Sequence, residues 1–274
     1  NTVGTIKSCT VENSTITGTN ENTASQSLAG GIAAFNVEGT IEECEVTGGS
    51  VSTSGSMEVS SVGGIAAVNE GTVTECSNSA SVTGNNTFNL KEKEEVSFGP
   101  GGVVGCNYSC VESCSNTGSV TGHGSFTGGV VGYNTTNNTT DGTISASHNT
   151  GAVEGEQYVG GVVGNNHTVV KGCYNTGEVT STGDYAGGVV GRNTSFYEDY
   201  SPIPNPPPNV ERKGEISTSY NTGAVSGGSY VGGVAGYNCV TIAQCFNTGN
   251  VTGAENYTGG VVGRNAYYIN DKYD

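Results

Sequence analysis

The chain has 274 residues and a formal net charge of −16, with 25 acidic residues against nine basic ones. Nucleic acids and anionic lipids are bound by clusters of basic side chains, so this charge excludes both as ligands. No apolar run approaches the roughly 18 residues that cross a bilayer, which excludes direct membrane insertion. Glycine contributes 46 residues and charged residues only 12%, unlike an ordinary globular domain.

Three short motifs recur in the same order along the whole chain. The first, Gly-Thr-Ile-x-x-Cys, occurs at 4–9 and 39–44 and with Val in place of Ile at 71–76, with degenerate copies at 109–114, 142–147, 168–173, 214–219 and 240–245. The second, Asn-Thr-Gly-x-Val-Thr-Gly, is clearest at 116–122 and 247–253. The third, Gly-Gly-Val-Val-Gly-x-Asn, occurs at 128–134 and again at 160–166, 187–193, 232–238 (with Ala for the second Val) and 259–265, and it is preceded by a copy at 101–107 and by looser copies at 30–36 and 63–69.

These repeats favour a stack of short strands. The shortest repeats span about 26–27 residues, a period typical of solenoids. Their apolar runs are short and bounded by Gly and Asn, and apolar residues do not recur at helical spacing. One repeat buries too little apolar surface to offset its conformational entropy, so neighbouring repeats must cover one another. The sequence therefore predicts an all-β, three-sided parallel β-solenoid (β-helix) of about eight coils, forming one domain over 1–274.

Stacking in register predicts columns of like residues. One inner wall is expected from Val82, Val120, Val153, Val179, Val225 and Val251. Ile16 and Val51 lie one residue further from the preceding Cys, which predicts a corner widened by one residue in the first two repeats. Asn tolerates left-handed backbone and forms turns, so two corner ladders are expected. They comprise Asn36, Asn69, Asn107, Asn134, Asn166, Asn193, Asn238 and Asn265, and then Asn78, Asn116, Asn149, Asn175, Asn221 and Asn247.

Insertions interrupt the repeats at two corners. Extra segments occur near 19–27, 52–60 and 85–99, and a proline-rich segment occupies 194–213. Proline prevents ladder pairing, so the last segment is expected to be an extended loop, and loops on rigid scaffolds are frequent binding sites. The candidate ligand contacts there are Tyr197 and Tyr200. Because 1–4 matches 36–39, the chain is expected to be a fragment of a longer repeat protein.

The repeated motifs resemble the GLUG motif repeats, whose Gly-Leu-x-Gly stretch corresponds here to Gly-Val-Val-Gly. The resemblance covers nearly the whole chain apart from the insertions, although Ala34 and Ala67 replace the last glycine of the third motif. That family occurs in bacterial surface and secreted proteins, including adhesin-like proteins and some IgA-specific metallopeptidases. The resemblance implies an extracellular, non-catalytic module at the bacterial cell surface, and it names no ligand.

Cysteines and histidines offer little chemistry. Six of the nine cysteines share one repeat position with Ser147 and Ser219, as expected of a small inward-facing residue: Cys9, Cys44, Cys76, Cys114, Cys173 and Cys245. Cys106, Cys110 and Cys239 lie outside this column, and Cys106 and Cys110 could pair with each other or with a neighbour. No Cys-x-x-Cys pair and no His-Glu-x-x-His motif occurs, so no metal is expected.

Catalysis and cofactor binding are not expected either. The three histidines, His123, His148 and His167, lie far apart in the chain, and the few Asp residues fall mostly in expected loops. The glycine-rich third motif is followed neither by a helix nor by the Lys-Ser/Thr of a phosphate-binding loop. The sequence therefore predicts no catalytic, metal-binding or cofactor-binding residues and no enzyme activity.

An aromatic column is the main candidate for ligand binding. Its members stand two residues before the Gly-Gly pair of successive repeats: Phe126, Tyr158, Tyr185, Tyr230 and Tyr257. One interpretation is a stacked ladder that shields the edge of the coil. The other is a flat strip for sugar rings, assisted by Tyr174, Tyr220 and Phe246 beside the second Asn ladder.

Two functions therefore stay open. The first is a rigid adhesive stalk that presents the loops at 85–99 and 194–213 to a host or bacterial surface protein or glycan. The second is a carbohydrate-binding module attached to a secreted enzyme, which would use the aromatic column.

Overall fold

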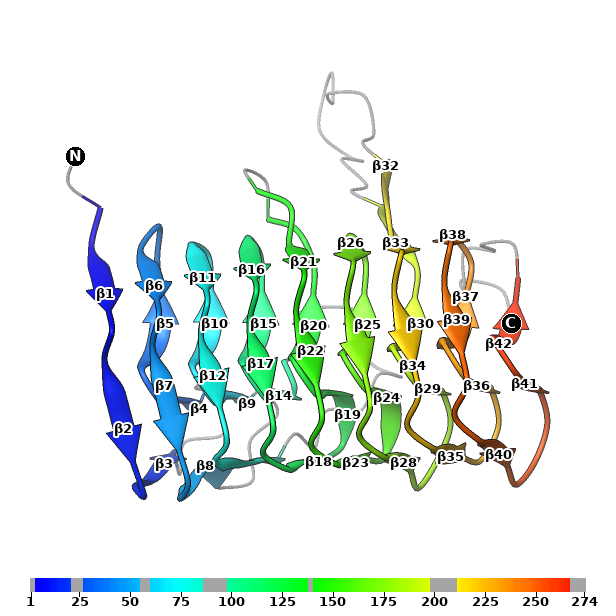
Figure 1. Ribbon diagram of the computed structural model, residues 1–274, viewed down its shortest axis with the longest axis horizontal. Helices are drawn as coiled ribbons and strands as arrows, with labels where there is room; N and C mark the ends of the chain where they lie inside the picture. Colours follow the sequence, from blue (N-terminus) through cyan, green and yellow to red (C-terminus); the bar gives the residue numbers. More distant parts are fainter. Residues whose placement is uncertain are drawn as a thin grey trace.

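The computed structural model describes residues 3–20, 27–54, 60–85, 98–137, 140–197 and 211–266. Within these residues the chain forms strands and turns only, wound into a rod in which equivalent strands of successive repeats lie side by side (Figure 1). Five parallel sheets run the length of this rod, each with eight strands. The predicted parallel β-solenoid is confirmed. The described part of the chain holds no helix long and apolar enough to cross a membrane.

Sheet 1 is formed by the Thr-Ile or Thr-Val segments of the first motif. Its strands are β1 (Thr5–Lys7), β6 (Thr40–Glu42), β11 (Thr72–Thr74), β16 (Cys110–Glu112), β21 (Thr143–Ser145), β26 (Val169–Lys171), β33 (Glu215–Ser217) and β38 (Thr241–Ala243). Alternate residues of a strand face opposite sides, so the central β-branched residue points inward, and Ile41 and Ile144 are fully buried.

Sheet 2 follows after two corner residues, and in the last six repeats its strands end at the second Asn ladder. Its strands are β2 (Thr10–Glu12), β7 (Glu45–Thr47), β12 (Ser77–Asn78), β17 (Ser115–Asn116), β22 (His148–Asn149), β27 (Tyr174–Asn175), β34 (Tyr220–Asn221) and β39 (Phe246–Asn247). In the first two repeats the register aligns Val11 with Val46, and Val46 with Asn78.

Sheet 3 contains the expected valine wall. Its strands are β3 (Thr15–Thr19), β8 (Ser50–Ser54), β13 (Ser81–Asn85), β18 (Val120–His123), β23 (Val153–Gly155), β28 (Val179–Ser181), β35 (Val225–Gly227) and β40 (Val251–Gly253). Ile16 pairs with Val51 and Val51 pairs with Val82, so the widened corner of the first two repeats is confirmed.

Sheets 4 and 5 are formed by the third motif and the residues before it. Sheet 4 comprises β4 (Ser27–Gly30), β9 (Ser60–Gly63), β14 (Pro100–Gly101), β19 (Ser125–Gly128), β24 (Gln157–Gly160), β29 (Ala186–Gly187), β36 (Val231–Gly232) and β41 (Thr258–Gly259). Sheet 5 comprises β5 (Ala33–Asn36), β10 (Ala66–Asn69), β15 (Val104–Asn107), β20 (Val131–Asn134), β25 (Val163–Asn166), β30 (Val190–Asn193), β37 (Ala235–Asn238) and β42 (Val262–Asn265). The turn between the two sheets brings backbones together: a Cβ on Gly129 would collide with the carbonyl oxygen of Gly161.

The expectation of three strands per repeat is wrong, because each repeat contributes five. The first motif ends in a corner between sheets 1 and 2, where the first corner residue has left-handed backbone, its φ lying between 47° and 64°. These residues are Ser8, Glu43, Glu75, Ser113, Ala146, Gly172, Thr218 and Gln244. Only one is glycine, so their side chains give no sign of the corner that their backbone makes.

The insertions leave the solenoid register unchanged. The residues after Asn193 leave the rod as β31 (Ser195–Tyr197), which pairs antiparallel with β32 (Glu211–Lys213) (Figure 1). On either side of this hairpin β26 still pairs with β33, and β30 with β37. The central parts of both predicted insertions, 86–97 and 198–210, lie outside the described residues, as do 21–26 and 55–59.

Candidate ligand-binding surface

The aromatic column lies at the start of sheet 4. All five members have left-handed backbone, with φ between 53° and 67°, which is uncommon and strained for bulky side chains. Successive rings, from Phe126 through Tyr158, Tyr185 and Tyr230 to Tyr257, stack with centroids 4.6 to 5.2 Å apart. The sequence therefore located a real column, although its unusual backbone carries no sequence signal.

This stacking limits what the column can contact. Because each ring lies face to face with its neighbours along the rod, the interior rings present their edges and hydroxyl groups to a ligand. Phe126 is buried, whereas Tyr257 in the last repeat is 55% exposed. The arrangement fits the shielding interpretation for the interior rings and gives no continuous flat strip for sugar faces. Ligand binding by these residues stays a prediction.

The hydroxyl group of Tyr185, in the middle of the column, is kept neutral. Burial raises the pKa of Tyr185, and the neighbouring Tyr158 and Tyr230 add to this effect. A neutral phenol both donates and accepts a hydrogen bond. The column can therefore offer a row of hydroxyls, repeated at the ladder spacing of about 4.8 Å, to a polar ligand that lies along the rod.

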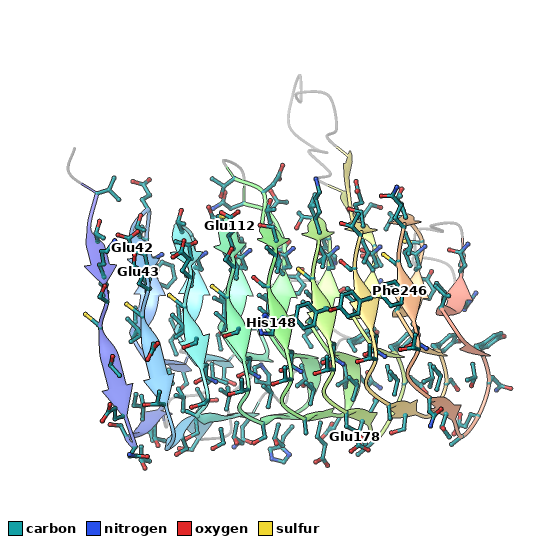
Figure 2. All side chains as sticks on the ribbon, viewed as in Figure 1. Glu42, Glu43, Glu112, His148, Glu178 and Phe246 are labelled. Atoms are coloured by element: carbon teal, nitrogen blue, oxygen red, sulfur yellow. The ribbon has the colours of Figure 1, made fainter. Side chains whose placement is uncertain are left out.

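A second aromatic row lies on sheet 2, on the side of the rod that faces the viewer in Figure 2. His148, Tyr174, Tyr220 and Phe246 stack with centroids 4.6 to 5.0 Å apart and nearly parallel planes. The sequence placed the last three together but missed His148, which also directly precedes an Asn of the second ladder. Burial lowers the pKa of His148, which favours the neutral imidazole in this stack.

A polar cluster on sheet 5 was not expected from the sequence. Tyr133 Oη lies 3.5 Å from His167 Nδ1, and Asn165 Nδ2 lies 3.2 Å from His167 Nε2. Burial and the charge of Arg192 lower the pKa of His167 to about 3, so the imidazole is neutral and Nε2 can accept from Asn165. Burial also raises the pKa of Tyr133 to about 12. These residues come from two successive repeats, and only the register brings them together.

The remaining candidate groups do not form a reactive site among the described residues. Cysteines at the last position of the first motif, such as Cys76 and Cys114, are buried in the interior repeats. No disulfide joins the cysteines of the described part of the chain. Burial raises the pKa of Cys106 well above its usual range, which keeps this thiol protonated and unreactive. No group of three His, Cys, Asp or Glu residues is placed to hold a metal ion in the described ranges.

The two candidate tyrosines of the insertion cannot be assessed in the same way. Tyr197 ends β31, but its side chain lies outside the described part, and Tyr200 falls in 198–210. Their predicted ligand contacts therefore stay predictions.

The fold and the columns together define a parallel β-solenoid repeat protein. Within this class, residues 155–180 match the family model of the GLUG motif, which confirms the resemblance found in the sequence. The matched segment starts at the end of β23 and reaches into β28, so it covers one repeat period including Tyr158 and His167. Searches of curated proteins and of solved structures gave no significant match.

Proposed function

We propose that this chain is a non-catalytic, extracellular repeat module of a bacterial surface protein. It acts as a rigid scaffold that holds out inserted loops for adhesion to a host or bacterial surface protein or glycan. The GLUG motif and the solenoid support the repeat-module part of this proposal. The surface context and the adhesive role follow from the family resemblance and from the way the insertions are accommodated.

The observation that carries the proposal is the independence of the loops from the scaffold. The β31–β32 hairpin stands away from the rod, and the strands before and after it keep the pairing seen in all other repeats (Figure 1). Both aligned ladders and stacked apolar columns make each repeat rigid relative to the next. A scaffold of this kind can vary its loops without cost to its own fold, as adhesive modules require.

The test is a matched pair of loop deletions. Replacing 198–210 by two glycines should abolish adhesion of protein-coated beads to cells, while replacing 86–97 serves as the comparison deletion. Circular dichroism and urea unfolding would check that each variant keeps the β-solenoid. If both variants are folded and adhere as well as the parent chain, the loops are not the adhesive elements and the proposal fails.

A second candidate function is carbohydrate recognition by a module attached to a secreted enzyme. The stacked column, with its row of tyrosine hydroxyls, favours this candidate. Tyr185→Ala combined with Tyr230→Ala should abolish binding on a glycan array, because two adjacent hydroxyls and ring edges would be lost. Tyr174→Ala combined with Tyr220→Ala is the matched control, since it removes two stacked tyrosines from the second aromatic row, on sheet 2. Equal loss in both double variants would argue against recognition by the column.

A further inference from the structure

Two of the few basic residues lie on one face of the rod. Arg192 in β30 and Arg264 in β42 occupy the variable position of the third motif, and Tyr237 in β37 stands between them in the same register. We call these three residues the Arg–Tyr row. Successive strands of a sheet are about 4.8 Å apart, so two ladder steps place the backbones of the two arginines roughly 10 Å apart along the rod.

The arginines of this row lie against the aromatic column. Arg192 Cζ is 5.7 Å from the centre of the Tyr158 ring. Arg264 Cζ is 5.7 Å from the centre of the Tyr230 ring and 5.8 Å from that of Tyr257. These distances are typical of cation–π contacts, which hold a guanidinium by its face. A guanidinium held in this way keeps N–H groups along its edge for a planar anion such as a carboxylate.

Nearby acidic groups are engaged elsewhere. Asp184 accepts a hydrogen bond of 2.8 Å from the backbone N–H of Ser229, and Glu255 accepts one of 3.0 Å from the Ser229 hydroxyl. Arg264 is exposed and forms no ion pair with any residue that the structure describes. In a chain with 25 acidic residues, a face that carries two guanidiniums therefore differs in charge from the rest of the rod.

We propose that the Arg–Tyr row and the aromatic column form a docking surface for a linear acidic saccharide. The sugar chain lies along the rod, its carboxylates bind Arg192 and Arg264, and its hydroxyl groups bond to the tyrosine hydroxyls between them. A pyranose residue advances an extended chain by roughly one ladder step, so the best ligand carries a carboxylate on every second sugar. This inference rests on the carbohydrate-recognition candidate and specifies its ligand class.

The experiment uses a defined probe and charge-matched variants. Calorimetry measures binding of oligosaccharides of alternating glucuronic acid and N-acetylglucosamine, and of the same oligosaccharides with their carboxyl groups reduced to alcohols. The variant Arg192→Gln/Arg264→Gln is compared with Lys7→Gln/Lys171→Gln, which removes two positive charges from sheet 1. Arg264→Lys keeps the charge but loses the planar fork, and its exposed position in the last repeat makes it the variant least able to disturb folding.

The expected result is a loss of affinity of about tenfold or more in the arginine double variant, with little change in the lysine double variant. Arg264→Lys should lie between the parent chain and the double variant, and the reduced oligosaccharide should not bind. Equal binding of the reduced probe would overturn the acidic specificity while leaving sugar recognition standing. Absence of binding to either probe, or equal losses in the two double variants, would overturn the docking surface. If the glycan array also gave no ligand, carbohydrate recognition itself would fall.

Discussion

The corner between sheets 2 and 3 is built in two different ways along the same rod. In the last six repeats it is turned by an Asn of the second ladder, whereas the first two repeats place valine there and add one residue. The flanking strands keep their parallel pairing through the change. We call the corner with Asn the polar solution and the corner with valine and one extra residue the apolar solution. Comparing the two shows which interactions each corner depends on.

The polar solution depends on one side chain that satisfies several backbone groups. Asn175 donates to the carbonyl of Gly177 and to Asn221 Oδ1, both at 2.8 Å, and it accepts from the Gly177 N–H and from Asn149. The side chain is fully buried, so every one of these bonds replaces contact with water. The amide therefore closes its own corner and joins it to both neighbouring repeats.

The apolar solution depends on backbone conformation. Val46 is buried in the position of the Asn, and the extra residue is accommodated by Gly48 and Gly49 with φ of 65° and 71°. Asn13, which aligns with Gly48, also has a positive φ of 45°. Because left-handed backbone turns the chain without a side-chain bond, a longer loop with tolerant residues can replace a short loop with a specific amide.

The largest expected effect comes from Gly161, the glycine that packs against the side-chain amide of Asn175. A Cβ on Gly161 would collide with the Gly188 carbonyl and with the Asn175 side chain. Gly161→Ala should therefore lower the free energy of unfolding by about 3 kcal/mol or more, measured by urea unfolding. Gly260→Ala changes the equivalent glycine of the last repeat, where a Cβ meets no atom within 4 Å, and should be close to neutral. Similar losses in both variants would contradict the steric account.

Removing the amide itself should have the next largest effect. Asn175→Ala leaves the buried N–H and C=O of Gly177 without partners and interrupts the ladder, so we expect a loss of about 3 kcal/mol in unfolding free energy. Thr176→Ala alters the exposed neighbour and should change stability by less than about 0.5 kcal/mol. A stable Asn175→Ala protein would mean that the backbone alone turns this corner.

The two solutions can also be exchanged. Val46→Asn places an amide in a corner that is one residue too long, which should cost about 1–2 kcal/mol. Deleting Gly48 as well produces Asn-Thr-Gly-Ser-Val, which matches the second motif, and should recover most of that loss. The measurement is the urea midpoint of the single and combined variants. A combined variant less stable than both single variants would show that the two solutions are not interchangeable.

The smallest expected effect, taken over a single pH unit, concerns the other corner, where Asn36 to Asn265 form one unbroken ladder. His167 comes directly after Asn166 of this ladder in the sequence. Burial lowers the pKa of His167 to about 3, so as the pH falls the unfolded chain binds a proton that the folded chain does not bind. The contribution of neutral His167 to the free energy of unfolding is fully present above the unfolded pKa near 6.5. It is lost as the pH falls toward 3, by at most about 1.4 kcal/mol per pH unit. His167→Gln should show a weaker decline in urea midpoint than the parent chain, and parallel declines would exclude this assignment.

Much of the interior could be read from the sequence because it repeats exact residue types. Valines such as Val120 and Val153 and the Asn residues of both ladders recur at fixed places, and stacking turns each recurrence into a column. The one-residue difference in spacing from the preceding Cys was also informative, because the displaced Ile16 and Val51 predicted the wider corner. Repetition thus reports on inward-facing and corner positions, where packing restricts the choice of residue.

The outward surface and the local backbone could not be read in the same way. Corner residues such as Glu43 and Gln244 adopt left-handed backbone without the glycine that usually marks it, so the fivefold division of each repeat was missed. The cluster of Tyr133, Asn165 and His167 and the Arg–Tyr row join variable positions of different repeats. Such groupings depend on register, which becomes known only when the strands are paired.

The direction of the ladder bonds has a mechanical consequence for a rod of this kind. The hydrogen bonds between repeats run along the long axis, so tension applied along that axis would load the repeat interfaces one after another, in series. Each interface from the third repeat onward is joined by two Asn amide bonds, as between the fifth and sixth repeats, where Asn149 bonds Asn175 and Asn166 bonds Asn193. The first two interfaces each have only one Asn–Asn bond, from Asn36 to Asn69 and from Asn69 to Asn107, because Val46 faces Val11 and Asn78 at the other corner. Under an axial pulling force these two interfaces are where the rod would begin to open.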